Sequence, residues 1–496
     1  MITLPDEIYL NIVQSLPDLA SLKHVKEFED YRQISTTLAS VCLVSRTFCA
    51  LAQPLLYRAY IEDEDNSDWH RSSPADDSTR LQLFLRTLIH RPDLAAKVEY
   101  LRLADDLSQP NIKPYCPFGD LFIKASRKIC AFYKSLSLDK PRLHRGLVWQ
   151  SDWQHGLRKT GTYDAEVALL LALLPNLEKL DMYIGQRNIG RFVSLLCPGV
   201  VEAESWREEI QIEGGEQTRV YKVTQASPTL ELPFLARLSS LSFIAAPENP
   251  VVDVYLLKHV ACLSSLESLC VDRGFSSYEE ETVFRLPLQH IRNLTLKECT
   301  MLDTHMRSLV KSCGNLRSLH ITLTSYLGLP GMNLDALLEC LTSSSQTLEE
   351  LQICLPSTSP TRRHDSITQD ETFDLRSFAR LRTIEISMEC LFAPTSDAEP
   401  SFTALLPTSI DDLYLRMADK RFAKHLRVLA EEYKSFPNLK VLDIGIEDTS
   451  KFHAMDQAEV DWKLALNDCA RELRSAGIEC NVPVEGTRFN LYCGND

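Results

Sequence analysis

Cysteine and histidine are the side chains of this sequence that could ligate a metal ion or act as nucleophiles. The 496 residues include 15 cysteines and 12 histidines. A zinc site needs paired ligands at short spacing, and the sequence contains no Cys-x-x-Cys. The odd number and scattered placement of the cysteines predict reduced, mostly buried thiols. We therefore expect neither a metal nor a cofactor.

The linear motifs of common enzyme classes are also absent from the sequence. It has no Gly-x-x-x-x-Gly-Lys phosphate loop, no His-Glu-x-x-His zinc motif and no Gly-x-Ser-x-Gly nucleophile turn. The histidines His144, His155 and His320 fit surface or core positions better than catalytic ones. The sequence therefore predicts a binding protein and not an enzyme.

Charge and hydropathy limit the classes of partner. The formal net charge of −15 argues against general binding to nucleic-acid backbones, which requires clustered Lys and Arg. The strongly apolar run Val167–Leu174 is far shorter than the roughly 20 residues of a membrane-spanning helix, and we expect it to be buried. The first residues lack the features of a signal peptide. We expect no nucleic-acid partner, no membrane partner, and a cytoplasmic or nuclear location.

A repeated leucine frame, aliphatic-x-x-aliphatic-x-aliphatic, organises most of the chain. It begins at Val98 and Leu177, and then recurs regularly, with starts at Leu238, Leu266, Ile291, Leu316, Leu348, Leu381, Ile410 and Leu439. The last eight starts are separated by 28, 25, 25, 32, 33, 29 and 29 residues. This period fits leucine-rich repeats with small insertions and is shorter than the roughly 40-residue HEAT or armadillo unit.

The frame has a direct structural meaning. Two aliphatic residues of each Leu-x-Leu pair point inward from a short strand, and the residue between them faces the concave side. Apolar stretches such as Met306–Val310 and Leu334–Leu338 predict helices on the convex side. Because one repeat cannot bury its apolar face alone, the units must stack. The expected fold is an α/β solenoid of short parallel strands that alternate with helices.

Five segments are expected along the chain. They are a helical region (1–60), an acidic linker (61–80), irregular or degenerate repeats with insertions (81–232), regular repeats (233–446) and a C-terminal cap (447–496), which contains a helix near Trp462–Leu473. The period fails at 104–165 and 197–232, which are insertions, degenerate repeats or loops packed against the solenoid. Residues 356–372 read as a polar surface loop.

The first 60 residues predict two amphipathic helices. The first contains Pro5 in its first turn and repeats an apolar residue every four positions. The second is expected to start after Ser35-Thr36-Thr37, whose hydroxyls favour helix capping, and to stop before Pro54. So short a segment cannot bury much apolar surface alone. Its helices either dock on another protein or cap the first repeats.

Two stretches of this region, "LPDEIYLNIVQSL" from Leu4 and "LASVCLVSRTFCALAQPLLYRAY" from Leu38, resemble an F-box, with a Pro-Leu-Leu-Tyr ending of fungal style. The spacer between Leu16 and Val44 is longer than is usual for that family. The repeats resemble the cysteine-containing leucine-rich repeats that often follow an F-box, with Cys299 and Cys313 at the family's cysteine positions. The fold implied is an N-terminal helical F-box followed by a leucine-rich-repeat solenoid with irregular insertions.

The resemblance implies the substrate-recognition subunit of an SCF-type E3 ubiquitin ligase. In such ligases the F-box docks on a Skp-type adaptor that binds a cullin-RING assembly, and the repeats bind the target protein. The adaptor-binding residues it implies are Leu4, Pro5, Ile8, Ile12, Leu16, Leu43, Val44 and Phe48. The alternative is a leucine-rich-repeat scaffold that acts outside the ubiquitin system.

Target binding is expected on the concave face of the repeats. Aromatic residues and arginine are the types most often found at binding hot spots. The concave-facing candidates on the strands are Tyr100, Arg102, Asp181, Tyr183, Asp272, His320, Glu350, Tyr414 and Arg416.

Overall fold

The structure is a computed structural model that divides into two compact units. Unit 1 comprises residues 1–203 and 225–266, and unit 2 comprises residues 204–224 and 267–496. The residues described are 28–62, 80–104, 116–136, 151–160, 163–184, 206–213, 216–223, 235–245, 252–253, 256–261, 263–275, 283–285, 288–301, 303–323, 332–354, 367–368, 374–387, 402–418, 422–446 and 457–481.

All ten leucine frames form short strands, which pair in parallel with their sequence neighbours. In unit 1 the paired strands, in order, are β1 (Ala59–Ile61), β2 (Tyr100–Leu103), β3 (Lys179–Ile184) and β6 (Ser240–Ala245). In unit 2 they are β8 (Ser268–Asp272), β11 (Asn293–Cys299), β12 (Ser318–Leu323), β14 (Glu350–Cys354), β16 (Thr383–Ser387), β17 (Asp412–Ala418), β18 (Val441–Ile446) and β19 (Glu479–Asn481).

The register stacks the aliphatic residues of successive frames. Leu294 of β11 pairs with Leu269 of β8 on one side and with Leu319 of β12 on the other. All three side chains are buried, whereas the residues that alternate with them are half-buried. Full burial of each leucine contributes roughly 1.5–3 kcal/mol. The buried aliphatic side chains of successive frames therefore form a continuous apolar layer along one side of the sheet.

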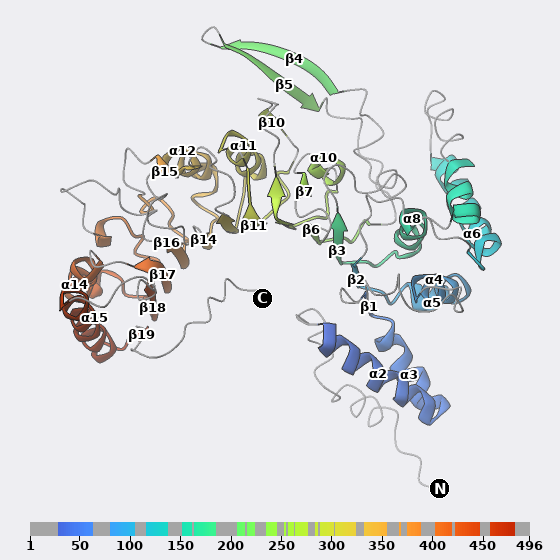
Figure 1. The fold of residues 1–496 in the computed structure, drawn as a ribbon, viewed down its shortest axis with the longest axis horizontal. Helices are drawn as coiled ribbons and strands as arrows, with labels where there is room; N and C mark the ends of the chain where they lie inside the picture. Colours follow the sequence, from blue (N-terminus) through green and yellow to red (C-terminus); the bar gives the residue numbers. More distant parts are fainter. Residues whose placement is uncertain are drawn as a thin grey trace. The chain divides into compact units, whose positions relative to one another are not determined.

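The predicted helices of unit 2 lie along one side of these strands (Figure 1). Met306–Val310 lies in α11 (Asp303–Cys313), and the predicted stretch Leu334–Leu338 opens α12 (Leu334–Leu341). Met306, Leu309 and Val310 are buried, as a helix packed on an apolar layer requires. The other helices of this unit are α14 (Phe422–Glu432), α15 (Gln457–Ser475) and the 3-10 turns η6 (Thr342–Ser344), η8 (Phe402–Ala404) and η9 (Tyr433–Ser435).

The last described elements continue the repeat pattern. Helix α15 contains the predicted helix Trp462–Leu473 and packs against α14. Gly477, with φ of +90°, ends the helix in the left-handed conformation, and the Ile478 N–H donates to the Leu473 carbonyl at 3.1 Å. The chain then turns into β19, whose Cys480 pairs with Leu442 of β18.

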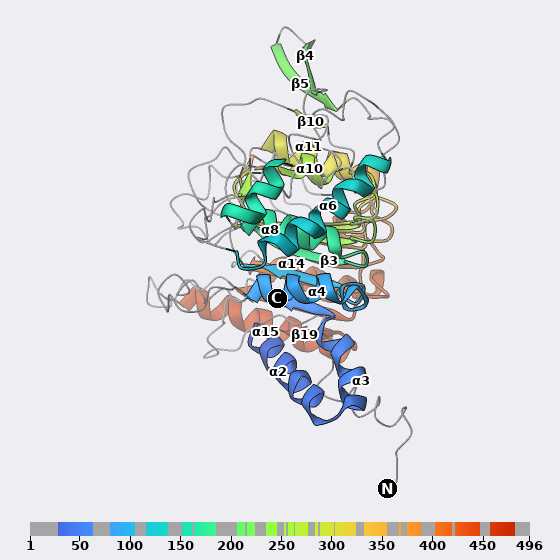
Figure 2. The same ribbon diagram turned by 90° about the vertical axis from the view of Figure 1, so that its right-hand side faces the viewer.

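Unit 1 contains helices that interrupt the repeat period. They are α4 (Arg80–His90), α5 (Pro92–Ala95), α6 (Gly119–Leu136), the π-helix η3 (Gly156–Thr160), α8 (Tyr163–Leu173) and α10 (Leu257–Val260), with the two-residue strand β7 (Val252–Asp253). Figure 2 shows α4, α6 and α8 side by side. Residues Val167–Leu171 of α8 are buried on all sides, as the apolar run predicts. The buried Trp153 indole donates to the Ala165 carbonyl at 3.0 Å.

Unit 2 also includes short strands outside the repeat ladder. The β4 (Trp206–Glu213) and β5 (Glu216–Val223) strands form an antiparallel hairpin within the aperiodic region 197–232, and β10 (Val283–Arg285) pairs with β5 in parallel. The β13 (Met332–Asn333) and β15 (Ile367–Thr368) strands pair with each other. The second of these lies in the segment 356–372 that was expected to be a loop.

The N-terminal helices differ from their predicted bounds. Helix α2 spans Phe28–Val44 and therefore contains Ser35–Thr37, and α3 spans Arg46–Leu56 and includes Pro54. The expected capping hydroxyls instead bond within the helix, since Thr37 Oγ1 donates to the Gln33 carbonyl at 2.8 Å. The break falls at Ser45, whose hydroxyl accepts from the Phe48 N–H at 3.2 Å. A start after Ser35–Thr37 and a stop before Pro54 were wrong.

Among the described residues, no helix has the length and hydropathy needed to cross a membrane. The first predicted helix, with Leu4, Pro5, Ile8, Ile12 and Leu16, lies outside the described residues, as does nearly all of the acidic linker.

Candidate functional site

The junction of α2 and α3 exposes two large apolar side chains. Leu43 is 88% exposed and Val44 is 69% exposed, the highest values for large hydrophobic residues in the described part of the chain. Both lie at the C-terminal end of α2, directly before the Ser45 cap that starts α3. Exposing two adjacent aliphatic side chains to water is unfavourable, so this junction is a candidate protein contact.

The opposite faces of the two helices are packed inside unit 1. Ile34 and Leu38 of α2 and Ala52 of α3 are buried with Ala59 and Tyr100 of the first two strands. A hydrogen bond of 3.0 Å from the Tyr31 hydroxyl to the Ala59 carbonyl also joins α2 to β1. This packing is the capping contact that was the alternative to docking, and it orients Leu43 and Val44 away from the core.

Phe48, a third predicted adaptor contact in this region, has a different environment. It is half-buried and packs against the α2–α3 core instead of standing free beside Leu43 and Val44. The neighbouring cysteines, Cys42 and Cys49, are half-buried, and burial, followed by the interaction with Cys49, raises the pKa of Cys42 to about 11. The apolar surface presented by the described part of this motif is therefore centred on Leu43 and Val44.

A second candidate surface is the polar face of the unit 2 strands. One row of it runs across the sheet in register, with one residue per strand: Cys270, Thr295, His320, Gln352, Glu385, Tyr414, Asp443 and Asn481. Most of these side chains are half-buried, and Asn481 is exposed. The sheet thus presents a continuous polar surface that is opposite the leucine layer.

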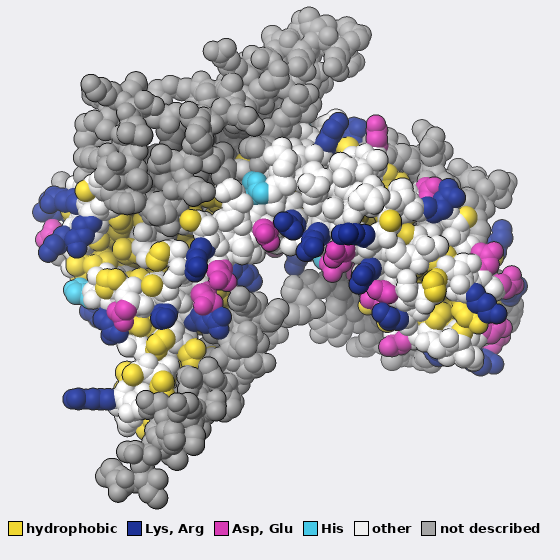
Figure 3. All heavy atoms as spheres, turned by 180° about the vertical axis from the view of Figure 1, so that it is seen from behind, with side chains coloured by type: hydrophobic (Ala, Val, Ile, Leu, Met, Phe, Trp, Pro, Cys, Tyr) yellow, Lys and Arg dark blue, Asp and Glu magenta, His cyan; other side chains and the backbone are white. Residues whose placement is uncertain are grey.

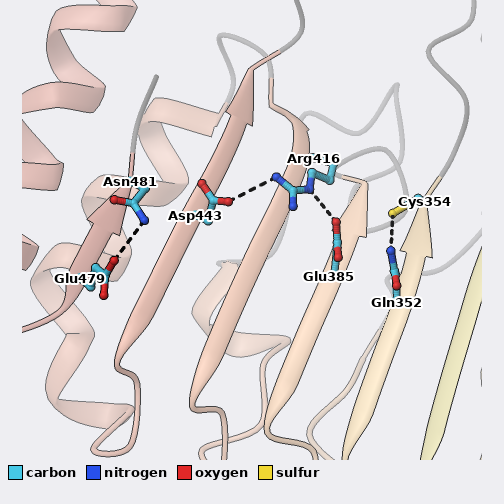
Figure 4. Close-up of polar contacts among 7 residues, drawn as sticks. All are labelled: Gln352, Cys354, Glu385, Arg416, Asp443, Glu479 and Asn481. Atoms are coloured by element: carbon cyan, nitrogen blue, oxygen red, sulfur yellow. Dashed lines mark hydrogen bonds and ion pairs between the residues drawn. The ribbon is translucent and has the colours of Figure 1, made fainter. Parts of the chain in front are cut away.

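Arg416 connects three strands of this face (Figure 4). Its Nε atom donates to Glu385 Oε1 at 2.7 Å and its Nη1 atom to Asp443 Oδ2 at 3.4 Å. Burial lowers the pKa of Arg416, but the hydrogen bond to Glu385 and the two carboxylate charges outweigh it, so the pKa is raised. The guanidinium also lies 5.8 Å from the Tyr414 ring centroid. Tyr414 and Arg416 were both predicted for target binding, and they lie together.

His320 forms a second polar cluster with Ser318 and Glu350. Its Nε2 atom lies 3.0 Å from Ser318 Oγ and 3.6 Å from Glu350 Oε2, and Ser318 Oγ donates to the same carboxylate at 3.1 Å. A catalytic triad needs the serine and the carboxylate on different ring nitrogens, so this geometry is not a serine hydrolase site. Burial lowers the pKa of His320 against the opposing charge of Glu350.

The remaining predicted residue of unit 2, Asp272, is half-buried on the same polar face. It pairs with Lys297 in the strand register, and its Oδ1 lies 3.7 Å from Arg273 Nε. Burial raises the pKa of this carboxyl, and the charge of Arg273 opposes that shift.

The predicted target-binding residues of unit 1 are much less accessible. Tyr100, Asp181 and Tyr183 are each less than 8% exposed. The Tyr100 hydroxyl donates to Asp181 Oδ2 at 2.6 Å, and Arg102 Nη2 donates to the Tyr183 hydroxyl at 3.3 Å. Burial, followed by the Asp181 charge, raises the pKa of Tyr100 far above its usual value. In this structure three of the four side chains are interior groups, and the hydrogen bonds among the four join β2 to β3.

A charged row at the N-terminal ends of the unit 2 strands was missed by sequence reasoning. It is formed by the second residue of each frame: Glu267, Arg292, Arg317, Glu349, Arg382, Asp411 and Lys440. After Glu267, each backbone N–H in the row donates to the carbonyl of the preceding member, as in Arg382 to Glu349 at 2.9 Å. The signal was present in the sequence, since the charges recur at a fixed position of the frame.

The described cysteines show no metal or redox arrangement. All eleven are free thiols, and Cys299 and Cys313 are fully buried in unit 2. Burial raises the pKa of Cys313 to about 12 and that of Cys299 still further. Among the described residues, no group of three or more His, Cys, Asp and Glu could hold a metal ion.

Comparisons with known proteins give a weak structural similarity to a leucine-rich-repeat protein. No protein-family profile matches the sequence, and neither does any protein of curated function. A leucine-rich-repeat protein of Leptospira interrogans is similar in structure, with 12% identity and a TM-score of 0.16, over 63% of this chain and 92% of that one. The repeat architecture itself rests on the strand register and burial described above.

Proposed function

We propose that this chain is the substrate-recognition subunit of an SCF-type E3 ubiquitin ligase. In this proposal Leu43 and Val44 belong to a surface that docks on a Skp-type adaptor, which in turn binds a cullin-RING assembly. The observation that carries the proposal is the exposure of these two residues within the motif that resembles an F-box. The role implies a cytoplasmic or nuclear protein that performs no chemistry itself.

The repeats would supply the target-binding surface. The polar face of unit 2 offers Tyr414 and Arg416 in a half-buried setting, where aromatic and arginine side chains contribute most to binding. Arg416 is held by two carboxylates, so its position is fixed before a target arrives. The buried residues Tyr100, Asp181 and Tyr183 would support the fold of unit 1 instead.

The test of adaptor docking is a double substitution, Leu43→Ala with Val44→Ala. Leu43 is 88% exposed and Val44 is 69% exposed, so a partner can bury both side chains. The double substitution removes five side-chain carbons, each contributing about 0.8 kcal/mol when buried. Weighted by the exposed fraction that the partner can newly bury, the loss is about 3 kcal/mol, or roughly 200-fold in Kd. Isothermal titration calorimetry with a purified Skp-type adaptor measures this change.

Leu83→Ala on α4 is the matched control, because Leu83 is also exposed (38%) and lies outside the motif. It should leave the adaptor affinity unchanged. A deletion of residues 1–60 is a poor control, since it removes α2, α3 and their core with β1. A wild-type chain that captures no adaptor, or a double variant that binds as tightly as wild type, would support the alternative of a repeat scaffold outside the ubiquitin system.

A further inference from the structure

A depression of about 530 Å³ lies at the N-terminal ends of four neighbouring strands of unit 2. Strands β14, β16, β17 and β18 each follow one wall of it, and the lining residues are Glu349, Ala379, Arg380, Arg382, Ser409, Asp411, Asn438 and Lys440. The charged row therefore crosses this depression. Ligand pockets for small apolar molecules are lined mainly by hydrophobic groups, whereas Ala379 is the only apolar residue of this lining.

Most residues of the charged row form an ion pair with a neighbour of opposite charge. Arg292 lies 3.9 Å from Glu267, and Arg317 lies 3.9 Å from Glu349. Lys440 lies 3.4 Å from Asp411. Figure 3 shows basic and acidic side chains close together in a line across this face of the molecule. These pairs neutralise both carboxylates that line the depression.

Two arginines in the depression remain unmatched. Arg380 and Arg382 are exposed, and in the described part of the chain neither guanidinium has a hydrogen-bond or ion-pair partner. The nearby Arg376 differs, because its guanidinium is held by Asp374 at 2.6 Å. Two adjacent unpaired guanidinium groups are notable in a chain whose formal net charge is −15. They supply a local positive charge at the wall of the depression.

We propose that this depression binds an acidic segment of a partner protein, with Arg380 and Arg382 as the contacts to its Asp or Glu carboxylates. The inference rests on the proposed role of the repeats as the target-binding part. A guanidinium matches a carboxylate by two parallel hydrogen bonds. An incoming carboxylate would give Arg382 an anion of its own, since its acidic neighbours in the row are paired with Arg317 and Lys440.

The two free guanidinium groups suit two separate carboxylates of one segment. Arg382 lies in register between Glu349 and Asp411, as the strand pairing of the residues that follow them shows. Neighbouring strands are about 4.8 Å apart, so a ligand in the depression meets both carboxylates. Because both carboxylates already have basic partners, the attraction for an anion comes from Arg380 and Arg382. The depression also spans four repeats, which suits an extended segment.

The test is fluorescence anisotropy of the full chain with three labelled 12-residue peptides: Ser-Glu repeats, Ser-Gln repeats and Ser-Gln repeats with one phosphoserine. We expect the Glu peptide to bind and the Gln peptide not to bind. Arg380→Ala with Arg382→Ala should weaken binding of the Glu peptide about tenfold. The control is Arg292→Ala with Lys311→Ala, which removes the same charge from exposed positions of unit 2 outside the depression.

The control variant should bind within twofold of the wild type. Equal loss in both double variants would reduce the effect to net charge and overturn the site. No binding of the Glu peptide to the wild type would overturn it as well, and tighter binding of the phosphoserine peptide would overturn the choice of carboxylate. The adaptor is absent from this assay, so a failure of adaptor capture and a failure of peptide binding are separate results.

Discussion

Replacing Tyr100 by phenylalanine tests whether the buried polar cluster of unit 1 is structural. The Tyr100 hydroxyl donates to Asp181 Oδ2 at 2.6 Å, and both side chains are less than 8% exposed. Lys179 contacts both of these residues, since its Nζ atom lies 3.8 Å from Asp181 Oδ2 and 4.6 Å from the Tyr100 ring centroid. The substitution removes one oxygen and keeps the ring in place.

The expected cost follows from the burial of the acceptor. A hydrogen bond to a charged group contributes about 1.5–3 kcal/mol, and an orphaned buried acceptor keeps its desolvation penalty. Lys179 offsets part of that penalty, because its ammonium group remains beside the carboxylate. We therefore expect Tyr100→Phe to lower the free energy of unfolding by about 2 kcal/mol.

The assay is urea denaturation of the wild type, Tyr100→Phe, Asp181→Asn and the double variant. The double-mutant cycle should give a coupling energy above about 1 kcal/mol, since the two residues share one hydrogen bond. Tyr414→Phe is the matched control: it removes a tyrosine hydroxyl from the half-buried polar face of unit 2 and should cost less than about 0.5 kcal/mol. A coupling energy near zero would refute the structural role and return Tyr100 to the list of target contacts.

Three further predictions concern local features. Ser45→Ala should destabilise the protein by about 1 kcal/mol in urea denaturation, because it removes the side-chain cap of α3; an unchanged midpoint would show that this cap contributes nothing. Burial lowers the pKa of His290 and of His320 below the unfolded value of 6.5. The unfolded chain therefore binds protons first, and the free energy of unfolding should fall as the pH drops below about 6.5. Substituting both histidines by glutamine should flatten that fall, and an identical pH slope would contradict the assignment. Cys299 and Cys313 should resist iodoacetamide at pH 8 in the native protein and react after unfolding, as peptide mass spectrometry can show, since burial raises both thiol pKa values.

The strands could be predicted from the sequence because their signal is local. Each Leu-x-Leu pair supplies its own inward face, as Leu294 and Leu296 do in β11. The even spacing of the frames then implies stacking without any knowledge of distant contacts. The same reasoning succeeded for α11, α12 and α15, each of which buries apolar side chains.

Helix bounds at the N-terminus could not be predicted in the same way. Ser35–Thr37 and Ser45 both offer capping hydroxyls, and composition alone gives no reason to choose between them. The structure uses Ser45, since burial of Ile34 and Leu38 against the first strand requires α2 to continue past Ser35–Thr37. Tertiary packing thus overrides the local capping preference.

Sequence alone determined the repeat period, the inward leucine layer and which residues alternate with it. It could not determine which alternating residues are accessible. Asp181 and Tyr414 hold the same position in their frames, yet Asp181 is buried with Tyr100 and Tyr414 is half-buried beside Arg416. The unpaired state of Arg380 and Arg382 was likewise decided only by the fold. The physical reason is that exposure and ion pairing depend on neighbours from other strands, such as the partner of Tyr100 that lies 81 residues along the chain.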